Sequence, residues 1–173
     1  GIFVPPLLPW KVLEAPLNLY KAACAKSGHQ PDIVYIRPVY LEENESVIRR
    51  EVEPYLLNFL AFNASPVESL QSEEKKAELR AKGYGFYASG ALESLTRLTY
   101  EEIVEQEIGF IGTPKKVIAQ IENLQSRGGI GELAIVANFG GIEHWKSIKT
   151  QQLFAQQVMP AFRGAGQTAM SGR

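Results

Sequence analysis

The sequence predicts an α/β fold in which short parallel strands alternate with amphipathic helices. Three observations support this prediction. The stretch 32–41 is rich in β-branched and aromatic residues, a second apolar run spans Leu133 to Ala137, and segments with helical periodicity lie between the apolar runs. A parallel sheet whose strands are connected by helices is typical of this alternation.

The clearest unit is EIGFIGTPKKVIAQIENLQSRGGIGELAIVAN, residues 107–138. Thr113 is suited to cap a helix, and Pro114 is suited to its first position, where no backbone N–H is needed. Apolar residues then recur on one helical face, and a cluster of glycines ends the helix. The continuous apolar run that follows is typical of a strand covered on both faces.

The other elements continue the pattern. Residues 2–4 are predicted to form a short strand, and helices are expected at about 14–27, 45–62 and 143–163. Trp10 falls in a proline-rich loop before the first of these helices. The acidic run LEENES agrees with the preference of a helix start for negative charge.

One proline and two segments depart from this alternation. Pro38 lies within the strand at 32–41 and predicts a bulge or a strand end, because proline cannot donate to a ladder. Residues 63–108 form a long excursion, which we interpret either as a lid or as a helical hairpin with no binding role. Residues 164–173 are small and polar and predict a flexible tail.

Composition excludes several classes of protein. The 173 residues include 18 basic and 19 acidic side chains, and a net charge of −1 gives no reason to expect nucleic acid or an anionic membrane as partner. No apolar run approaches the roughly 20 residues that a membrane span needs. The single cysteine fits a reducing cytoplasm, and it and the two histidines lack metal-site spacing. The missing initiator Met suggests a piece of a longer protein, although processing or a cloning remnant would also explain it.

Several motifs resemble, in the same order, the C-terminal end of the bacterial luciferase-like monooxygenases. They are LYKAACAKSGHQPD, RPVYLEENESVIRREVEPYL, GTPKKVIAQIENL, GGIGELAIVANFGG and LFAQQVMPAFR. The resemblance covers residues 1–163, which we expect to form one domain. It implies a TIM-type (β/α)8 barrel in which residues 2–4, 32–41 and 132–137 are strands six to eight and residues 63–108 are the lid insertion.

The resemblance also implies a cytoplasmic flavin-dependent monooxygenase, which uses reduced FMN and O2 to oxidise a small organic substrate. Some relatives use a deazaflavin instead, and the full-length parent is expected to be a homo- or heterodimer. The family binds most of the flavin with earlier barrel segments that have no counterpart here, so the isolated chain is expected to be an incomplete, inactive fragment. Two alternatives remain: a non-catalytic, flavoprotein-like or structural subunit that pairs with another chain, and an unrelated α/β binding domain. Fewer than three parallel strands would favour the last.

Active sites of such barrels lie at the carboxyl ends of the strands. The candidate cofactor or substrate residues at these ends are Trp10, Arg37, Tyr40, Asn138, Phe139 and Gly140. Arg37 stands out, because a charge within an apolar strand is costly unless it is paired or faces a polar cavity. A salt bridge to a helix carboxylate or a solvent-facing tip would also explain Arg37, loop packing would explain Trp10, and a plain turn would explain the glycines. No catalytic residue can be assigned.

The lid excursion has aromatic residues of its own. Tyr84, Phe86 and Tyr87 lie in a glycine-rich stretch and are candidates to close over a substrate, although a local hydrophobic cluster would explain them as well. A partial barrel also leaves two strand edges unpaired, so we expect the isolated chain to self-associate or aggregate.

Overall fold

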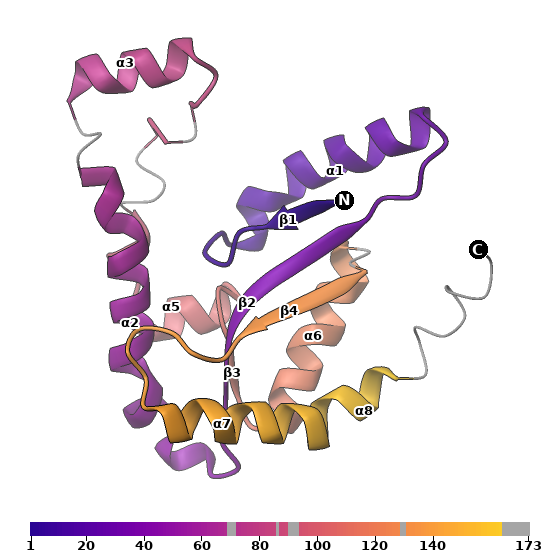
Figure 1. The fold of residues 1–173 in the computed structure, drawn as a ribbon, viewed down its shortest axis with the longest axis vertical. Coiled ribbons are helices and arrows are strands. Elements are labelled where there is room, and N and C mark those ends of the chain that lie inside the picture. Colours follow the sequence, from indigo (N-terminus) through magenta and orange to yellow (C-terminus); the bar gives the residue numbers. More distant parts are fainter. Residues whose placement is uncertain (69–71, 86, 90–93, 129–130, 164–173) are drawn as a thin grey trace.

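The computed structural model describes residues 1–68, 72–85, 87–89, 94–128 and 131–163 (Figure 1). The predicted tail, 164–173, and Phe86 therefore lie outside the described residues. Within the described part, four strands form one sheet and every observed pairing is parallel. The predicted α/β class with a parallel sheet is confirmed, and the criterion for an unrelated domain, fewer than three parallel strands, is not met.

Strand β2 (Ile33–Leu41) is the centre of the sheet, because each of the other strands pairs with it. β1 (Ile2–Val4) pairs with its first residues, and β4 (Glu132–Val136) pairs with it from Val34 to Pro38. β3 (Phe110–Gly112) pairs with the last three residues of β2. In the spatial order β1–β2–β4, β1 and β2 are connected through α1 alone, whereas the segment from α2 to α6 lies between β2 and β4.

The strand end that the sequence allows at Pro38 is not observed, because β2 continues through Pro38 to Leu41. It is the last residue of β2 that pairs with β4, and the next residue, Val39, pairs with Phe110 of β3. The sequence did not predict β3, because a three-residue strand is too short to show an alternating pattern.

The helices follow the predicted order with different ends. They are α1 (Trp10–Lys26), α2 (Glu45–Glu68), α3 (Glu73–Ala81), α5 (Tyr100–Glu105), α6 (Pro114–Gly128), α7 (His144–Leu153) and α8 (Met159–Phe162). α1 begins at Trp10, so the prediction of a loop there was wrong. α2 continues through Pro54 and past residue 62, so the predicted lid boundary at 63 falls inside a helix. The predicted cap of α6 is confirmed, since Thr113 Oγ1 accepts from Lys116 N at 3.4 Å.

A π-helical turn, η1 (Phe154–Val158), joins α7 to α8. Leu153 and Val158 lie five residues apart and are both buried, which is the spacing of one π turn. Gln157 Nε2 donates to Glu43 Oε1 at 3.0 Å, and Thr150 Oγ1 accepts from the backbone N–H of Leu41 at 3.3 Å. Thr150 of α7 and Gln157 of η1 therefore hold the carboxyl end of β2 and the residues just after it.

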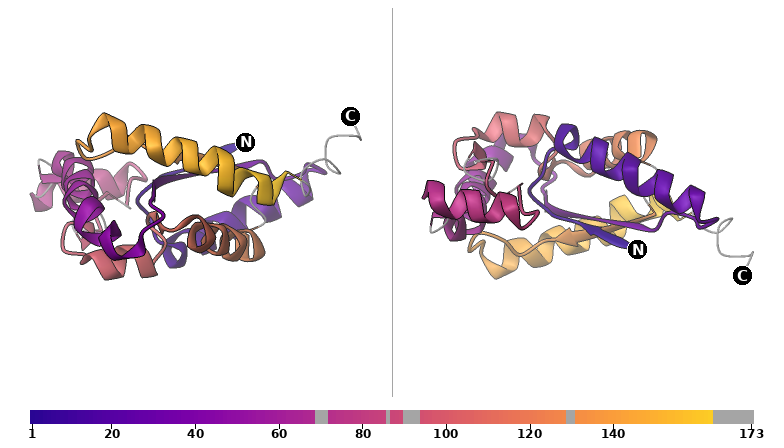
Figure 2. Two further views of the ribbon diagram at one scale, coloured as in Figure 1. Left: turned by 90° about the horizontal axis from the view of Figure 1, so that it is seen from below. Right: turned by 90° about the horizontal axis from the view of Figure 1, so that it is seen from above.

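Two apolar clusters make up the core. The first lies between the sheet and the helices α1 and α6, which both views of Figure 2 place next to each other, and η1 joins it through Val158. Its members from β2 are the alternate residues Ile33, Tyr35, Val39 and Leu41. The second cluster lies between α2, α5 and the carboxyl ends of the strands, where Figure 1 shows α2 standing upright beside β2.

The other face of the sheet is much less covered. The strand register places Phe3, Val34, Ile36 and Ala134 on it, opposite the first cluster. Phe3 is 73% exposed, and the other three are half-buried. The expectation that the strand at 132–137 is covered on both faces was therefore wrong. Since parallel sheets are normally covered on both faces, this inner face is an incomplete core.

We predict that the isolated chain self-associates through this inner face and the open edges of β1 and β4. Phe3→Lys should reduce association, because it places a charge on the exposed apolar face. The check is sedimentation velocity at several protein concentrations. Leu19→Lys, at an equally exposed apolar position on α1, is the control and should change nothing. A native chain that stays monomeric at every concentration would contradict the prediction.

Candidate functional site

The parallel strands bring their carboxyl ends to one edge of the sheet, where ligands bind in open and closed α/β sheets alike. Two of the predicted site residues, Tyr40 and Phe139, meet there in the second apolar cluster, together with α2. Trp10 and Arg37 lie apart from them, in the layer that contacts residues 105–107 and α6. The structure thus separates the candidates into two groups.

Tyr40 faces α2 and is almost fully buried. Its hydroxyl donates to Glu51 Oε2 at 2.7 Å. Burial raises the pKa of Tyr40 far above its ordinary value, and the hydrogen bond to Glu51 raises it further. The hydroxyl is therefore protonated at neutral pH, and its proton is already engaged in holding α2 against the sheet.

The loop after β4 is clamped onto α2. The ring of Phe139 is buried and lies edge-to-face on Phe59, with centroids 5.8 Å apart and an interplanar angle of 62°. Asn58 Nδ2 donates to the carbonyl of Gly140 at 3.2 Å. Gly140 has φ of +60°, and a Cβ there would lie 1.7 Å from the carbonyl oxygen of Tyr55. Gly140, one of the predicted site residues, thus approaches the backbone of α2 closely, while Asn138 is exposed beside it.

A hollow of about 320 Å³ lies between this loop and α2. Its described lining is Asn58, Phe59, Phe62, Gly140 and Gly141. The three α2 residues were missed by the sequence analysis, because the apolar pattern of this helix indicated only core packing. The paired glycines after β4 were the signal that did indicate this place.

The role of Arg37 is neither a ligand contact nor the salt bridge or solvent-facing tip that the sequence left open. It is 1% exposed, and its guanidinium donates four hydrogen bonds to backbone carbonyls, of Pro5, Leu8, Ile36 and Glu107, at 2.8–2.9 Å. Its Cζ lies 4.1 Å from the centroid of the Tyr35 ring. Burial lowers the pKa of Arg37 to about 10, so the side chain stays charged at neutral pH. Because its donors bind the chain itself, we no longer include Arg37 among the ligand-binding candidates.

Trp10 lines a second, smaller hollow of about 200 Å³. The guanidinium of Arg127 lies 5.5 Å from the Trp10 ring centroid and forms an ion pair with Glu107. Asn123 Nδ2 donates to the other oxygen of Glu107 at 2.7 Å. Arg127 and Glu107 therefore neutralise each other in this hollow, and Trp10 packs against the guanidinium of Arg127.

Glu42 was also missed, because the acidic run that contains it was interpreted only as a helix start. It is buried at the end of β2, where Oε1 accepts from the backbone N–H of Glu43 at 2.8 Å and of Asn44 at 3.4 Å. Lys149 of α7 forms an ion pair with Oε2. Burial pushes the pKa of Glu42 upward, but the bonds from Lys149 and the backbone outweigh it and leave the pKa below its ordinary value.

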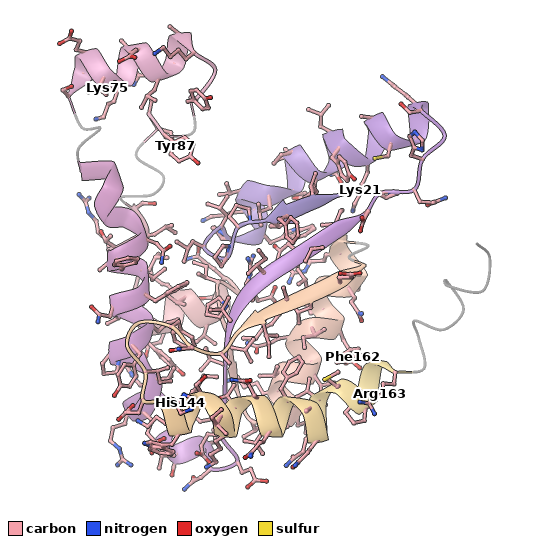
Figure 3. The ribbon with its side chains drawn as sticks, in the orientation of Figure 1. Lys21, Lys75, Tyr87, His144, Phe162 and Arg163 are labelled. Atoms are coloured by element: carbon pink, nitrogen blue, oxygen red, sulfur yellow. The ribbon has the colours of Figure 1, made fainter. Side chains whose placement is uncertain are left out.

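The described lid aromatics, Tyr84 and Tyr87, are both exposed. They belong to the turn that returns from α3, where Tyr84 N donates to Leu79 O at 2.8 Å. Figure 3 shows Tyr87 beside the end of α2 nearest α3, far from His144 at the start of α7. The structure therefore does not bring them to the strand ends. Within the described ranges, no cluster of side chains could hold a metal ion, and no helix is long and apolar enough to cross a membrane.

Comparison with known proteins defines the class. The sequence model of the luciferase-like monooxygenases matches residues 1–130, so the chain belongs to this family. A monooxygenase from Streptomyces bottropensis, RslO1, shares its fold with a TM-score of 0.62 and 22% identity over 94% of this chain and 42% of that one. The oxygenating constituent of 3,6-diketocamphane monooxygenase from Pseudomonas putida, a type II Baeyer–Villiger enzyme solved with FMN, shares it with a TM-score of 0.56 and 16% identity over 88% and 40%.

The chain spans about two fifths of the length of these structures. No curated protein sequence matches it.

Replacing Arg37 should destabilise the fold strongly. We predict that Arg37→Met lowers the free energy of unfolding by about 3 kcal/mol, because it leaves four partly buried carbonyls without their donor. Urea unfolding followed by circular dichroism measures this. Arg49→Met is the matched control, since Arg49 is an exposed arginine whose ion pairs with Glu53 and Glu101 are screened by solvent and contribute little. Equal effects of the two substitutions would contradict the role given to Arg37.

Glu42 should make stability depend on acid pH. Its pKa is lower in the folded chain than its unfolded value of 4.5, so its contribution is present above pH 4.5 and is lost as pH falls below that value. We expect Glu42→Gln to be less stable than the native chain near neutral pH, and this difference should shrink in acid. Urea unfolding at a series of pH values tests this, with Glu122→Gln, an exposed site on α6, as the control. A stability difference that does not change with pH would rule the interpretation out.

Proposed function

We propose that the chain is the C-terminal part of a flavin-dependent monooxygenase that uses reduced flavin and O2 to oxidise a small organic substrate. The observation that carries this proposal is the match of the family to residues 1–130, on a fold whose parallel strands end together beside an aromatic hollow. FMN is bound in one structure of similar fold, which supports a flavin here. A deazaflavin would fit the same proposal.

In this proposal β1, β2 and β4 are strands six to eight of a (β/α)8 barrel. Their neighbour order and parallel direction support it, as does the sparsely covered inner face, which would become the barrel interior. The segment from α2 to α5, with the predicted lid at 63–108, is then an insertion between strands seven and eight. The domain extends over residues 1–163.

The residues at the strand ends suit the flavin ring better than the flavin phosphate. Flavin supplies the electrons for O2 activation, while the protein binds the ring, excludes water and positions the substrate. Asn138 is exposed at this edge and available to a ring edge, and Phe139 and Gly140 fix the loop that carries it. The described lining of the larger hollow has no basic side chain, so we assign the flavin phosphate to other parts of the protein.

The same proposal includes the remaining expectations. The complete protein acts in the cytoplasm as a homo- or heterodimer, takes no nucleic acid or membrane as partner, and closes a lid that carries Tyr84, Phe86 and Tyr87. The chain alone is inactive, because the earlier barrel segments that bind most of the flavin have no matching positions here.

A second candidate function is favoured by the inner face of the sheet. Phe3 and its half-buried neighbours would be covered if this chain paired with another chain as a non-catalytic, flavoprotein-like or structural subunit. A defined complex of fixed stoichiometry that binds no flavin would support this candidate over the first.

Flavin titration tests the proposed function. We expect quenching of flavin fluorescence to saturate with a Kd of about 10 µM. Riboflavin should bind as well as FMN, because this part of the protein does not hold the phosphate. Asn138→Ala should weaken binding by about fivefold through loss of one hydrogen bond.

Asn18→Ala, an exposed asparagine on α1, is the matched control and should leave the affinity unchanged. The absence of saturable binding, or the same loss in both variants, would contradict a flavin contact at the strand ends. Much tighter binding of FMN than of riboflavin would show instead that this chain holds the phosphate.

A further inference from the structure

Part of the wall of the hollow between α2 and the loop after β4 is held in place by contacts within the chain. Phe59 is held by its edge-to-face contact with Phe139, and Asn58 is held by its bond to the Gly140 carbonyl. Gly140 fits against the backbone of Tyr55 with no room for a side chain. Sites that are formed in advance lose little entropy on binding, and a volume of about 320 Å³ is at the lower end of small-molecule sites.

The chemistry of the walls selects a ligand class. Phe59 and Phe62 supply aromatic surface, and Phe62 is 77% exposed, which leaves much of its ring for a ligand to cover. Gly141 has φ of +83°, and a Cβ there would meet nothing within 4 Å, so a flat molecule can approach the backbone at this point. Aromatic rings favour offset or edge-to-face contacts with other rings over contacts with saturated groups of equal size.

The polar groups in the described lining of the hollow can orient a ligand by hydrogen bonds, and they carry no charge. The described lining has a single polar side chain, Asn58, and no acid or base. Its Nδ2 bonds to Gly140, so its Oδ1 is the atom that can accept a hydrogen bond from a ligand. A phosphate or carboxylate would find no cation among the described lining residues.

We propose that this hollow binds the flat, uncharged aromatic part of the organic substrate, with a hydroxyl group of that substrate donating to Asn58 Oδ1. The identification of the ligand as the substrate rests on the proposed function. Binding of an aromatic molecule to the hollow does not, so the two proposals can fail separately.

The test uses 2-naphthol as a fluorescent probe on the purified 173-residue chain. We expect saturable binding, and we expect Phe62→Ala to weaken it by about tenfold through loss of a ring contact, while Phe62→Tyr retains it. Decahydro-2-naphthol, which has the same hydroxyl on a saturated frame, should compete poorly. Circular dichroism confirms that each variant keeps the native fold, and sedimentation measures its association state so that affinities are compared at the same state.

Phe3→Ala is the matched control, because Phe3 is the same residue type at 73% exposure on the inner face of the sheet. If Phe3→Ala weakens binding and Phe62→Ala does not, the probe lies on the sheet and the proposal is wrong. Equal affinity for the saturated competitor would show that general apolar burial, and not recognition of an aromatic ring, drives binding, and the proposal would be wrong. Displacement of the probe by riboflavin would show that the hollow holds the flavin ring and not the substrate. A loss of flavin binding with naphthol binding intact would overturn the proposed function alone.

Discussion

The structure depends on β2, because every observed strand pairing is made with it. A central strand that is also the longest carries the register of its neighbours, and a slip of one residue would move its apolar residues to the wrong face. Arg37 reinforces this register from within the strand. Its guanidinium reaches the loop after β1 and the turn before β3, so a single buried charge fixes the connections on both sides of β2.

The carboxyl end of β2 is held as firmly as its middle. Thr150 of α7 and Gln157 of η1 bond to it and to the residues just after it, Lys149 pairs with Glu42, and Tyr40 bonds to α2. The consequence is that α2 and the loop after β4 meet in a defined geometry. The candidate site is thus built on rigid elements, although most of the residues that make it rigid do not face it.

Local signals predicted much of this fold, and non-local contacts account for what they missed. The Thr-Pro start of α6 could be recognised because the cap and the helix are neighbours in sequence. The role of Arg37 could not, since its partners are up to 70 residues away and are backbone atoms with no side-chain signature. The role of Glu42 was missed for the same reason, because its ion-pair partner Lys149 is distant in sequence. The α2 side of the hollow was also missed, because it forms where Gly140 packs on Tyr55. Among the residues around the hollow, only the paired glycines after β4 indicated from the sequence that the chain comes close to another element there.

The pairing of β3 with the end of β2 has a consequence for how the chain folds. These two strands are adjacent in the sheet, yet the whole segment from α2 to α5 lies between them in sequence. Joining them closes a long loop, whereas β1 and β2, or α6 and β4, join through short ones, and closure entropy grows with loop length. The short units therefore form first, and the pairings of β3 and of β4 with β2, which both close long loops, form later. Because closure entropy grows only slowly with loop length, relatives can lengthen or shorten this excursion at little cost to the sheet.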